Sequence, residues 1–257
     1  MVKISEGDTV TIWIDSKRIY LVKVRKNGQF STDKGNIKFD EILGKEYGSF
    51  ITLSTGAKAY LLFPSLTDMY YGLRRPTQVM YPKDLGYVIF TSGVKPGDIV
   101  VEAGTGSGFL TATLSHFVGE SGKVYTYEIK EGFQKIAIEN VSKIGLNDRV
   151  VFKLKDVREG IDEKEVDAVF LDMADPWNAI PHAYSALKPS GSITIFIPTV
   201  NQIEKTYFAL KNTGFIDIHV EELILREYQV KEGAVRPKNI GVVHTGYIIR
   251  GRKYIKT

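Results

Sequence analysis

Three glycines at alternate positions, preceded by an acid, form the most informative motif of the sequence. After a short apolar run come Glu102, Gly104, Gly106 and Gly108. Glycine lets the backbone turn tightly and approach a ligand closely, and such an apolar run is typical of a buried parallel strand. A dinucleotide fingerprint needs glycine where Phe109 stands, and a P-loop needs a Lys-Ser or Lys-Thr pair after the glycines. The motif disfavours an NAD site, excludes a P-loop and predicts a glycine turn before a helix.

Two further acids stand at the ends of the next apolar runs. Glu128 lies 20 residues after Gly108 and belongs to the run over 123–129, and a Rossmann-like fold places its ribose-binding carboxylate at about this spacing. Asp156 follows the run over 150–155, where its carboxylate can accept a hydrogen bond from an adenine amino group. We therefore expect Glu128 to bind a ribose and Asp156 an adenine.

A third acid is the candidate for the reaction itself. The apolar run over 166–171 leads to Asp172, followed closely by Asp175, Pro176 and Trp177. Parallel sheets carry their chemistry at the carboxyl ends of strands, and a carboxylate beside a tryptophan can hold a flat heteroaromatic base. Asp175 has a second interpretation as the N-cap of a helix that begins at Pro176, and this is compatible with chemistry at Asp172.

The elements that position these acids alternate along the chain. Apolar spacing predicts helices over 85–94, 110–118, 133–144, 176–187 and 201–212, the first with Pro82 in its first turn and the last closed by Gly214. Strand-like runs cover 99–101, 123–129, 150–155, 166–171 and 191–197, and two final β runs cover 215–230 and 241–250. Alternating strands and helices predict an α/β fold, a mostly parallel sheet with an antiparallel C-terminal addition, over residues 69–257.

The first 68 residues have a different pattern. Short β runs over 9–14, 19–24, 29–31, 50–53 and 58–62 are separated by turn residues, which predicts a small N-terminal β domain over 1–68. Asn27-Gly28 lies between two of these runs and is a strong hairpin signal. The basic loop residues of this region could contact a nucleic acid or could form a solvated surface (Lys17, Arg18, Lys23, Arg25, Lys26).

Composition restricts the chemistry that the chain can use. The chain has 257 residues, 43% hydrophobic and 25% charged, with no cysteine and four histidines that make no metal-spaced pair. We expect no metal site, no disulfide and no membrane span, and therefore a cytoplasmic protein. The net charge of +4 permits a polyanionic partner without requiring one. The segment 70–84, rich in aromatic residues and arginines, is expected to be either the edge of a site or an interdomain linker.

These motifs resemble those of known methyltransferases. The pattern acid-x-Gly-x-Gly-x-Gly at Glu102 resembles the signature of Rossmann-like S-adenosylmethionine-dependent methyltransferases. Four stretches together are similar to the tRNA (adenine-N1)-methyltransferases of the TrmI family: Arg75 to Asp84, Glu102 to Thr111, Leu171-Asp172-Met173, and the tail with Arg236-Pro237 and His244-Thr245-Gly246-Tyr247. The similarity extends over nearly the whole chain.

The resemblance implies a fold, a reaction and a set of site residues. It implies a Rossmann-like catalytic domain beside the small β domain, a homotetramer, and methylation of N1 of T-loop adenines in tRNA, at adenine 58 with the adjacent adenine 57 left open. S-adenosylmethionine would contact Gln78, Glu102, Gly104, Thr105, Gly106, Ser107, Gly108, Phe109, Leu110, Glu128, Asp156 and Asp172. Tyr81 and Asp172 would line the catalytic adenine pocket. The tRNA would contact Arg74, Arg75, Trp177, Arg236 and Lys238.

The residues suit this chemistry independently of the resemblance. Adenine N1 carries an in-plane lone pair, so its methylation needs no strong base, and the cationic product ring can be stabilised by Asp172. Two alternatives remain open at this stage: a protein-repair isoaspartyl O-methyltransferase, and a tRNA-binding subunit that has lost the cofactor. A carboxyl acceptor does not favour an acid such as Asp172 beside it, and intact Glu102 and Glu128 argue against loss of the cofactor.

Overall fold

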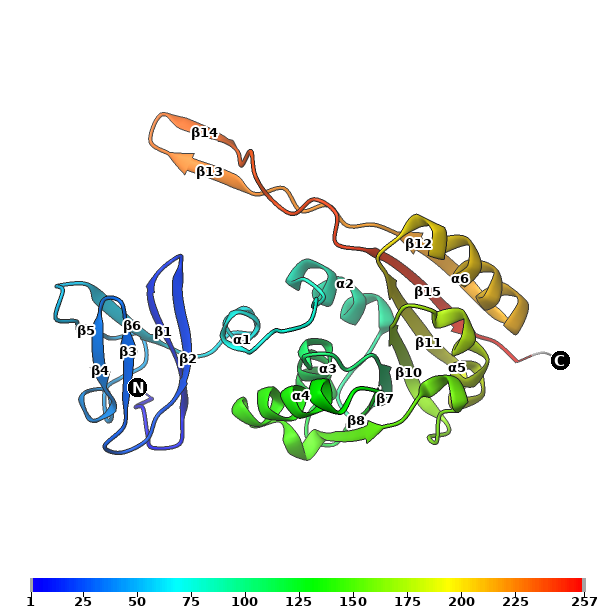
Figure 1. Ribbon diagram of the computed structural model, residues 1–257, viewed down its shortest axis with the longest axis horizontal. Coiled ribbons are helices and arrows are strands. Elements are labelled where there is room, and N and C mark those ends of the chain that lie inside the picture. The colour runs from blue at the N-terminus through cyan, green and yellow to red at the C-terminus, as the bar shows by residue number, and fades with distance from the viewer. Residues whose placement is uncertain (1, 256–257) are drawn as a thin grey trace. The chain divides into compact units, whose positions relative to one another are not determined.

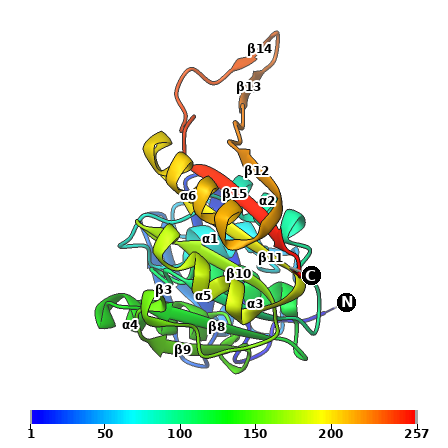
Figure 2. The same cartoon turned by 90° about the vertical axis from the view of Figure 1, so that its right-hand side faces the viewer.

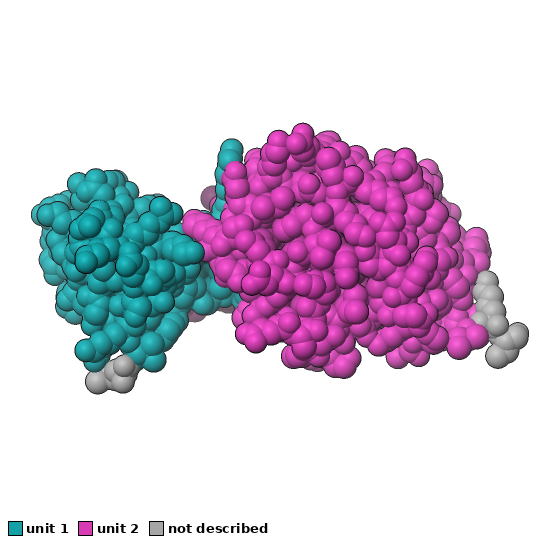
Figure 3. Space-filling model, turned by 90° about the horizontal axis from the view of Figure 1, so that it is seen from below, with its two compact units in different colours: residues 1–74 teal, residues 75–257 magenta. Residues whose placement is uncertain are grey.

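The chain folds into two compact units. The computed structural model describes residues 2–255, and the units divide between Arg74 and Arg75 (Figure 3). Each unit has its own hydrophobic core, and each is described separately below.

The first unit is built on an antiparallel sheet of order β2-β1-β6-β5. Its strands are β1 (Thr9–Asp15), β2 (Arg18–Lys23), β5 (Phe50–Thr52) and β6 (Lys58–Leu62), and a separate hairpin joins β3 (Gln29–Thr32) to β4 (Gly35–Lys38), followed by the short 3-10 helix η1 (Phe39–Glu41). Alternate residues of β1, Val10 and Ile12, are fully buried in the core of this unit, as the period of two along a strand requires. The predicted β domain is therefore present, and β4 is an additional strand.

Two details of this unit differ from the sequence expectation. Asn27-Gly28 forms a turn, but β2 pairs with β1 and β3 pairs with β4, so the predicted hairpin across this turn is wrong. Helix α1 (Leu66–Gly72) contains the position, residue 68, where the sequence suggested that the domain ends. A capping box between Ser65 and Asp68 begins this helix, which packs on β2. The first unit therefore continues to Arg74.

The second unit is a seven-stranded sheet of order β12-β15-β11-β10-β7-β8-β9 (Figure 1). Its strands are β7 (Ile99–Ala103), β8 (Lys123–Glu128), β9 (Val150–Leu154), β10 (Val166–Asp172), β11 (Leu187–Ile197), β12 (Phe215–Glu221) and β15 (Tyr247–Lys253). β7 to β11 are parallel, and β15 is antiparallel to both of its neighbours. The mostly parallel Rossmann-like sheet with an antiparallel C-terminal strand is confirmed.

Helices cover the sheet in two layers. They are α2 (Pro82–Ser92), α3 (Phe109–Val118), α4 (Glu131–Lys143), α5 (Ile180–Ala186) and α6 (Val200–Thr213), with 3-10 turns η2 (Asn147–Arg149), η3 (Val157–Glu159) and η4 (Pro176–Asn178). The strand order reverses at β7, so right-handed crossovers place α3 and α4 on one face and α5 on the other. This reversal opens a crevice at the carboxyl ends of the strands, where ligands bind in such sheets.

One predicted helix and the last two β runs differ from the structure. The predicted helix over 176–187 is divided into η4 and α5, and Leu187 already begins β11. The predicted β run over 215–230 ends with β12 at Glu221, and the run over 241–250 begins only at Tyr247, with β15. Between them, residues 222–246 form an extended segment, named the arm here, whose tip is the hairpin of β13 (Tyr228–Lys231) and β14 (Ala234–Pro237).

The arm extends away from the rest of the second unit in both views (Figures 1 and 2). Almost all of its residues are exposed, including apolar ones such as Val230 at 75% and Ile240 at 90%. A two-stranded hairpin is marginally stable by itself, and a row of exposed apolar side chains is typical of an interaction surface.

Candidate active site

A pocket of about 360 Å³ lies at the carboxyl edge of the parallel strands. It is lined by Thr77, Gln78, Ala103, Gly104, Gly106, Tyr127, Glu128, Ile129, Lys130, Phe133, Lys155, Asp156, Val157, Arg158, Asp172, Met173, Ala174 and Asp175. Six of the predicted cofactor residues are therefore brought together in one place: Gln78, Gly104, Gly106, Glu128, Asp156 and Asp172.

The glycine turn forms one wall of this pocket. Gly104 and Gly106 have φ angles of +92° and +53°, a left-handed conformation that glycine adopts without strain. A Cβ at Gly104 would overlap the carbonyl oxygen of Asp172. The first glycine therefore lets the end of β7 lie directly against the end of β10, which places both strand ends at the pocket.

Glu128 is held rigidly at the end of β8. Its Oε2 accepts a hydrogen bond from the backbone N–H of Gly106 at 2.9 Å, and its Oε1 accepts from the N–H groups of Ile129 and Lys130 at 2.9 and 3.0 Å. The residue is only 7% exposed. These three donors fix the orientation of the carboxylate, and each oxygen still has lone-pair capacity for a ribose hydroxyl.

Asp156 is joined to the opposite side of the pocket through an arginine. Arg158 donates from Nη2 to Asp156 at 2.6 Å and from Nη1 to Asp175 at 3.0 Å. The hydrogen bond from Arg158 holds the pKa of Asp156 below its usual value. Asp175 occupies the N-cap position of η4 with Pro176 first in the turn, as the second interpretation predicted, but its side chain makes no capping bond. Asp175 lines the pocket, as its first interpretation allowed, whereas no sequence motif predicted Arg158 there.

Asp172 ends β10 and lines the pocket, where the residue is partly exposed. Burial raises the pKa of its carboxyl to about 7, because desolvation disfavours the charged form. A carboxyl group with a pKa near neutral pH is common at reaction centres. The raised pKa and the position of Asp172 at the pocket make it a candidate for the reaction.

Glu102 lies beneath the glycine turn and does not line the pocket. It is fully buried, and its Oε2 accepts a hydrogen bond from the hydroxyl of Thr111 at 2.5 Å. Burial raises its pKa to about 8, so the carboxyl is largely protonated at pH 7. Its Oε1 has no hydrogen-bond partner among residues 2–255. The structure places this acid behind the turn.

The other residues of the motif support the turn from behind. The hydroxyls of Thr105 and Thr126 lie 2.6 Å apart, and Ser107 lies 2.6 Å from the hydroxyl of Thr77. Gly108, with φ +80°, is the N-cap of α3 and packs against Ala137 of α4. Phe109 and Leu110 are buried in the first turn of α3. None of these four motif residues lines the pocket: Thr105, Ser107, Phe109, Leu110.

Tyr81 and the residues expected to contact tRNA lie outside the pocket lining. Tyr81 is the N-cap of α2, and Arg74 and Arg75 stand on either side of the division between the units. Trp177 packs against the core of the second unit, with Lys205 Nζ 5.2 Å from its ring centroid. Arg236 and Lys238 belong to the arm, where Lys238 pairs with Glu227 at 2.7 Å.

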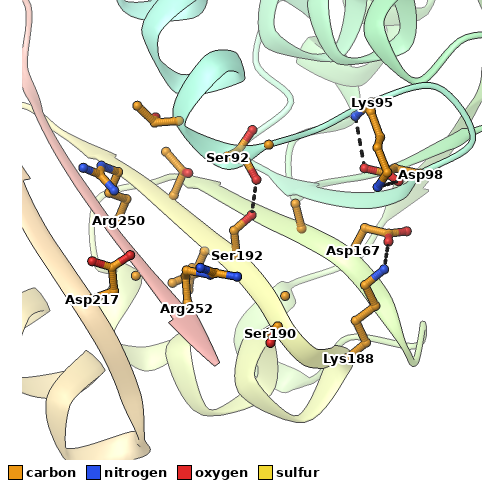
Figure 4. A pocket seen from close by; sticks show the side chains of 17 residues that line it. Ser92, Lys95, Asp98, Asp167, Lys188, Ser190, Ser192, Asp217, Arg250 and Arg252 are labelled. Atoms are coloured by element: carbon orange, nitrogen blue, oxygen red, sulfur yellow. Dashed lines mark hydrogen bonds and ion pairs between the residues drawn. The ribbon is translucent and has the colours of Figure 1, made fainter. Parts of the chain in front are cut away.

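A second pocket, of about 420 Å³, lies at the amino ends of β10 and β11 (Figure 4). None of the predicted site residues lines it. Its lysines are paired with acids, Lys95 with Asp98 at 2.8 Å and Lys188 with Asp167, as Figure 4 shows. Within residues 2–255 no group of three histidines and acids could hold a metal ion. No helix of this described range is long and apolar enough to span a membrane.

Four features together define the class of protein to which this chain belongs. They are the doubly wound sheet, the glycine turn, the fixed carboxylate of Glu128 and the acid at the end of β10. The fold and the pocket are those of a Rossmann-like S-adenosylmethionine-dependent methyltransferase. The family described as "tRNA methyltransferase complex GCD14 subunit" matches residues 59–248, and "TrmI-like N-terminal" matches residues 3–51. The chain therefore belongs to the TrmI family of tRNA methyltransferases.

Relatives and solved structures of this family match most or all of the chain. A tRNA (adenine(57)-N(1)/adenine(58)-N(1))-methyltransferase of Methanocaldococcus jannaschii is 39% identical over 91% of this chain and 90% of its own length. A tRNA (m1A58) methyltransferase structure from Aquifex aeolicus is 31% identical, covers both chains completely and has a TM-score of 0.82. A structure from Thermotoga maritima described as an S-adenosylmethionine-dependent O-methyltransferase is 39% identical, covers 99% of this chain and 96% of that one, and has a TM-score of 0.90.

Proposed function

We propose that this protein transfers a methyl group from S-adenosylmethionine to N1 of an adenine in the T-loop of tRNA, at adenine 58. The relative from Methanocaldococcus jannaschii has this reaction in its name, over nine tenths of both chains. The observation that carries the proposal is that Asp172 and Glu128, from the ends of two different strands, line the same pocket. The carboxylate proposed to bind the cofactor's ribose and the one proposed to bind the acceptor base thus line one small volume.

The residues that line the pocket support cofactor binding there. Glu128, fixed by three backbone donors, would accept hydrogen bonds from the two ribose hydroxyls. Asp156 would accept from the adenine amino group, with apolar contacts from Ile129 and Phe133. Gly104 and Gly106 leave the wall free of side chains. When bound, the cofactor supplies an electrophilic methyl group, and the protein supplies alignment.

Asp172 would act on the acceptor base. Its carboxylate would accept a hydrogen bond from the adenine N6 amino group, which orients N1 toward the pocket. The same negative charge would stabilise the positive charge that develops on the ring as N1 is methylated. Tyr81, at the start of α2, would pack on the base. No side chain needs to remove a proton, since N1 already carries its lone pair.

The tRNA would be held by basic residues of the segment before α2 and of the arm. Arg74, Arg75, Arg236 and Lys238 would bind backbone phosphates, and Trp177 would contact the RNA near the extruded base. Arg236 makes no ion pair within residues 2–255. Its free guanidinium on an exposed strand suits a phosphate contact.

We further propose a cytoplasmic homotetramer in which the small β domain (residues 1–68) assists the catalytic domain (residues 69–257) in binding tRNA. The exposed apolar residues of the arm support self-association, since burial of such a row on a partner subunit removes it from water (Ile224, Leu225, Tyr228, Val230, Val235, Ile240, Val242, Val243). Sedimentation equilibrium of the protein at micromolar concentration would test the assembly.

The reaction is tested by mapping methylated nucleosides by mass spectrometry after the protein acts on an unmodified tRNA transcript. We expect 1-methyladenosine at adenine 58, and none there in a matched transcript with guanosine at that position. Methylation of adenine 57 in the same transcript would add a second product. Methyl esters on a peptide substrate, with unmodified tRNA, would contradict the proposal and favour an O-methyltransferase.

A further inference from the structure

The two ends of the arm leave the sheet at the carboxyl edge, and few side chains hold them there. One limb follows β12 at Glu222 and Leu223, and the other precedes β15 at His244 and Thr245. Nearly all of the arm beyond these residues is exposed. Within one subunit, the direction of the arm therefore depends on the contacts at its base.

Lys83 joins both limbs to helix α2. Its Nζ donates to the carbonyl oxygen of Leu223 at 2.7 Å, to the hydroxyl of Thr245 at 2.6 Å and to Oδ1 of Asp84 at 2.7 Å. An ammonium group has three donors, so all of them are used. The side chain of Lys83 is 9% exposed and that of Asp84 is fully buried.

His244 ties the limbs to each other and to the sheet. Its Nδ1 lies 2.6 Å from Oε1 of Glu222, and its Nε2 lies 2.9 Å from the carbonyl oxygen of Pro198. Two acceptors suit an imidazolium, whose nitrogens both donate. The bond to Glu222 correspondingly raises the pKa of His244. The base of the arm is thus held by α2 on one side and by the end of β11 on the other.

A buried lysine is a costly way to stabilise a fold. Desolvation of an ammonium and a carboxylate offsets most of their attraction, and an apolar pair is often as stable. The ammonium group instead fixes the relative orientation of the segments it contacts, since Nζ must meet three acceptors from three segments at once. Lys83 is also two residues after Tyr81, in the first turn of the same helix.

We propose that Lys83 is a positioning residue that sets the direction of the arm relative to the pocket. This inference depends on the proposed function only in that the arm would bring Arg236 and Lys238 to the tRNA. The geometric part of the proposal, that Lys83 fixes the base of the arm, does not depend on which substrate the protein methylates.

Spin-label distances test the geometric part. The chain has no cysteine, so Glu232→Cys at the tip of the arm and Lys211→Cys on α6 give two unique labels in one chain. Diluting the labelled protein with unlabelled protein isolates the distance within one subunit. We expect a narrow distribution that broadens with Lys83→Met and is unchanged with the control Lys135→Met, an exposed lysine of α4.

Thr245→Val provides a second variant that keeps the side-chain shape and removes one acceptor of Lys83. It should broaden the distribution partially, and it keeps the test decisive where Lys83→Met fails to fold. Identical distributions in the parent protein, in Thr245→Val and in a folded Lys83→Met would overturn the proposal.

Kinetics separate positioning from a general loss of stability. In Lys83→Met we expect the KM for tRNA to rise about tenfold, with an unchanged dissociation constant for S-adenosylmethionine. A fall in kcat alone, with KM unchanged, would contradict a positioning role. If the protein does not methylate tRNA at all, the proposed function fails while the spin-label result still decides the role of Lys83.

Discussion

Glu128 and Gly106, 22 residues apart in the chain, are joined by a hydrogen bond of 2.9 Å from the glycine N–H to the glutamate carboxylate. The acid expected to bind the ribose thus also holds the glycine turn. One side chain therefore holds the glycine turn against the end of β8, and its removal should affect cofactor binding more than the loss of a ligand contact alone.

Glu128→Ala should weaken S-adenosylmethionine binding by roughly 10- to 100-fold, because hydrogen bonds to a charged group contribute about 1.5–3 kcal/mol. Glu128→Gln keeps one acceptor oxygen and should lose less. Titration calorimetry measures both dissociation constants. Glu131→Ala, which removes an exposed acid of α4, is the matched control. An unchanged dissociation constant for S-adenosylmethionine in Glu128→Ala would show that Glu128 does not bind the cofactor.

Gly104→Ala should destabilise the protein beyond the cost of a left-handed backbone. Gly93 has a similar φ of +73° with open space around its Cβ position, whereas a Cβ at Gly104 meets the backbone of Asp172. Gly93→Ala should therefore cost about 1–2 kcal/mol, and Gly104→Ala substantially more. Denaturant unfolding compares the two variants. Equal costs would show that the ends of β7 and β10 can separate freely.

Glu102→Gln should stabilise the protein increasingly as the pH rises. The pKa of Glu102 is about 8 in the folded state and near 4.5 when exposed, so between these values the folded state retains a proton that the unfolded state has released. Its contribution to stability therefore falls by roughly 1 kcal/mol per pH unit between pH 5 and pH 7. Urea unfolding of the variant and the parent at several pH values measures the difference.

The control for this prediction is Glu131→Gln. Lys135 lowers the pKa of Glu131 below its ordinary 4.5, so this carboxylate is ionised in both the folded and the unfolded state above pH 5, and its replacement should show almost no trend between pH 5 and pH 7. A difference between Glu102→Gln and the parent that stays constant from pH 5 to pH 7 would contradict the protonated state of Glu102.

Methyl transfer should depend on pH through Asp172. Burial raises its pKa to about 7 in the free protein, and the carboxylate is the form that accepts from N6 and stabilises a cation. The kcat/KM for S-adenosylmethionine should therefore rise with pH up to about 7 and then level, since this quantity reports the enzyme before the cofactor binds. A cationic cofactor should lower this pKa, so kcat itself should depend less on pH. A kcat/KM that is flat from pH 6 to pH 8 would contradict the prediction.

The placement of Glu128, Asp156 and Asp172 at one pocket followed from the sequence because each ends an apolar run. The carboxyl ends of parallel strands meet at one edge of the sheet, so strand order was not needed to bring them together. Whether they bind the cofactor stays a prediction. The position of Glu102 could not be predicted in this way, because a residue inside a strand can face either the pocket or the core.

Other features depend on contacts that sequence spacing does not encode. The bridge from Arg158 to Asp156 and Asp175 joins two loops whose relative position is set by the folded sheet. The β propensity of residues in the arm predicts strands there, but a strand of the main sheet also needs a neighbouring strand to pair with, and propensity does not supply one. Asn27-Gly28 forms a turn but no hairpin between β2 and β3, because β3 pairs with β4 instead.

The most direct measurement is single-turnover methyl transfer to an unmodified tRNA transcript by the parent protein and by Asp172→Ala, with the product identified as 1-methyladenosine. Loss of one electrostatic group at the reacting base should slow the step by about 10²–10³-fold, while tRNA affinity changes far less. Tyr81→Phe should react almost normally if the ring serves by packing. A full rate in Asp172→Ala, or methylation at N6 or on a protein carboxylate, would contradict N1 methylation assisted by Asp172.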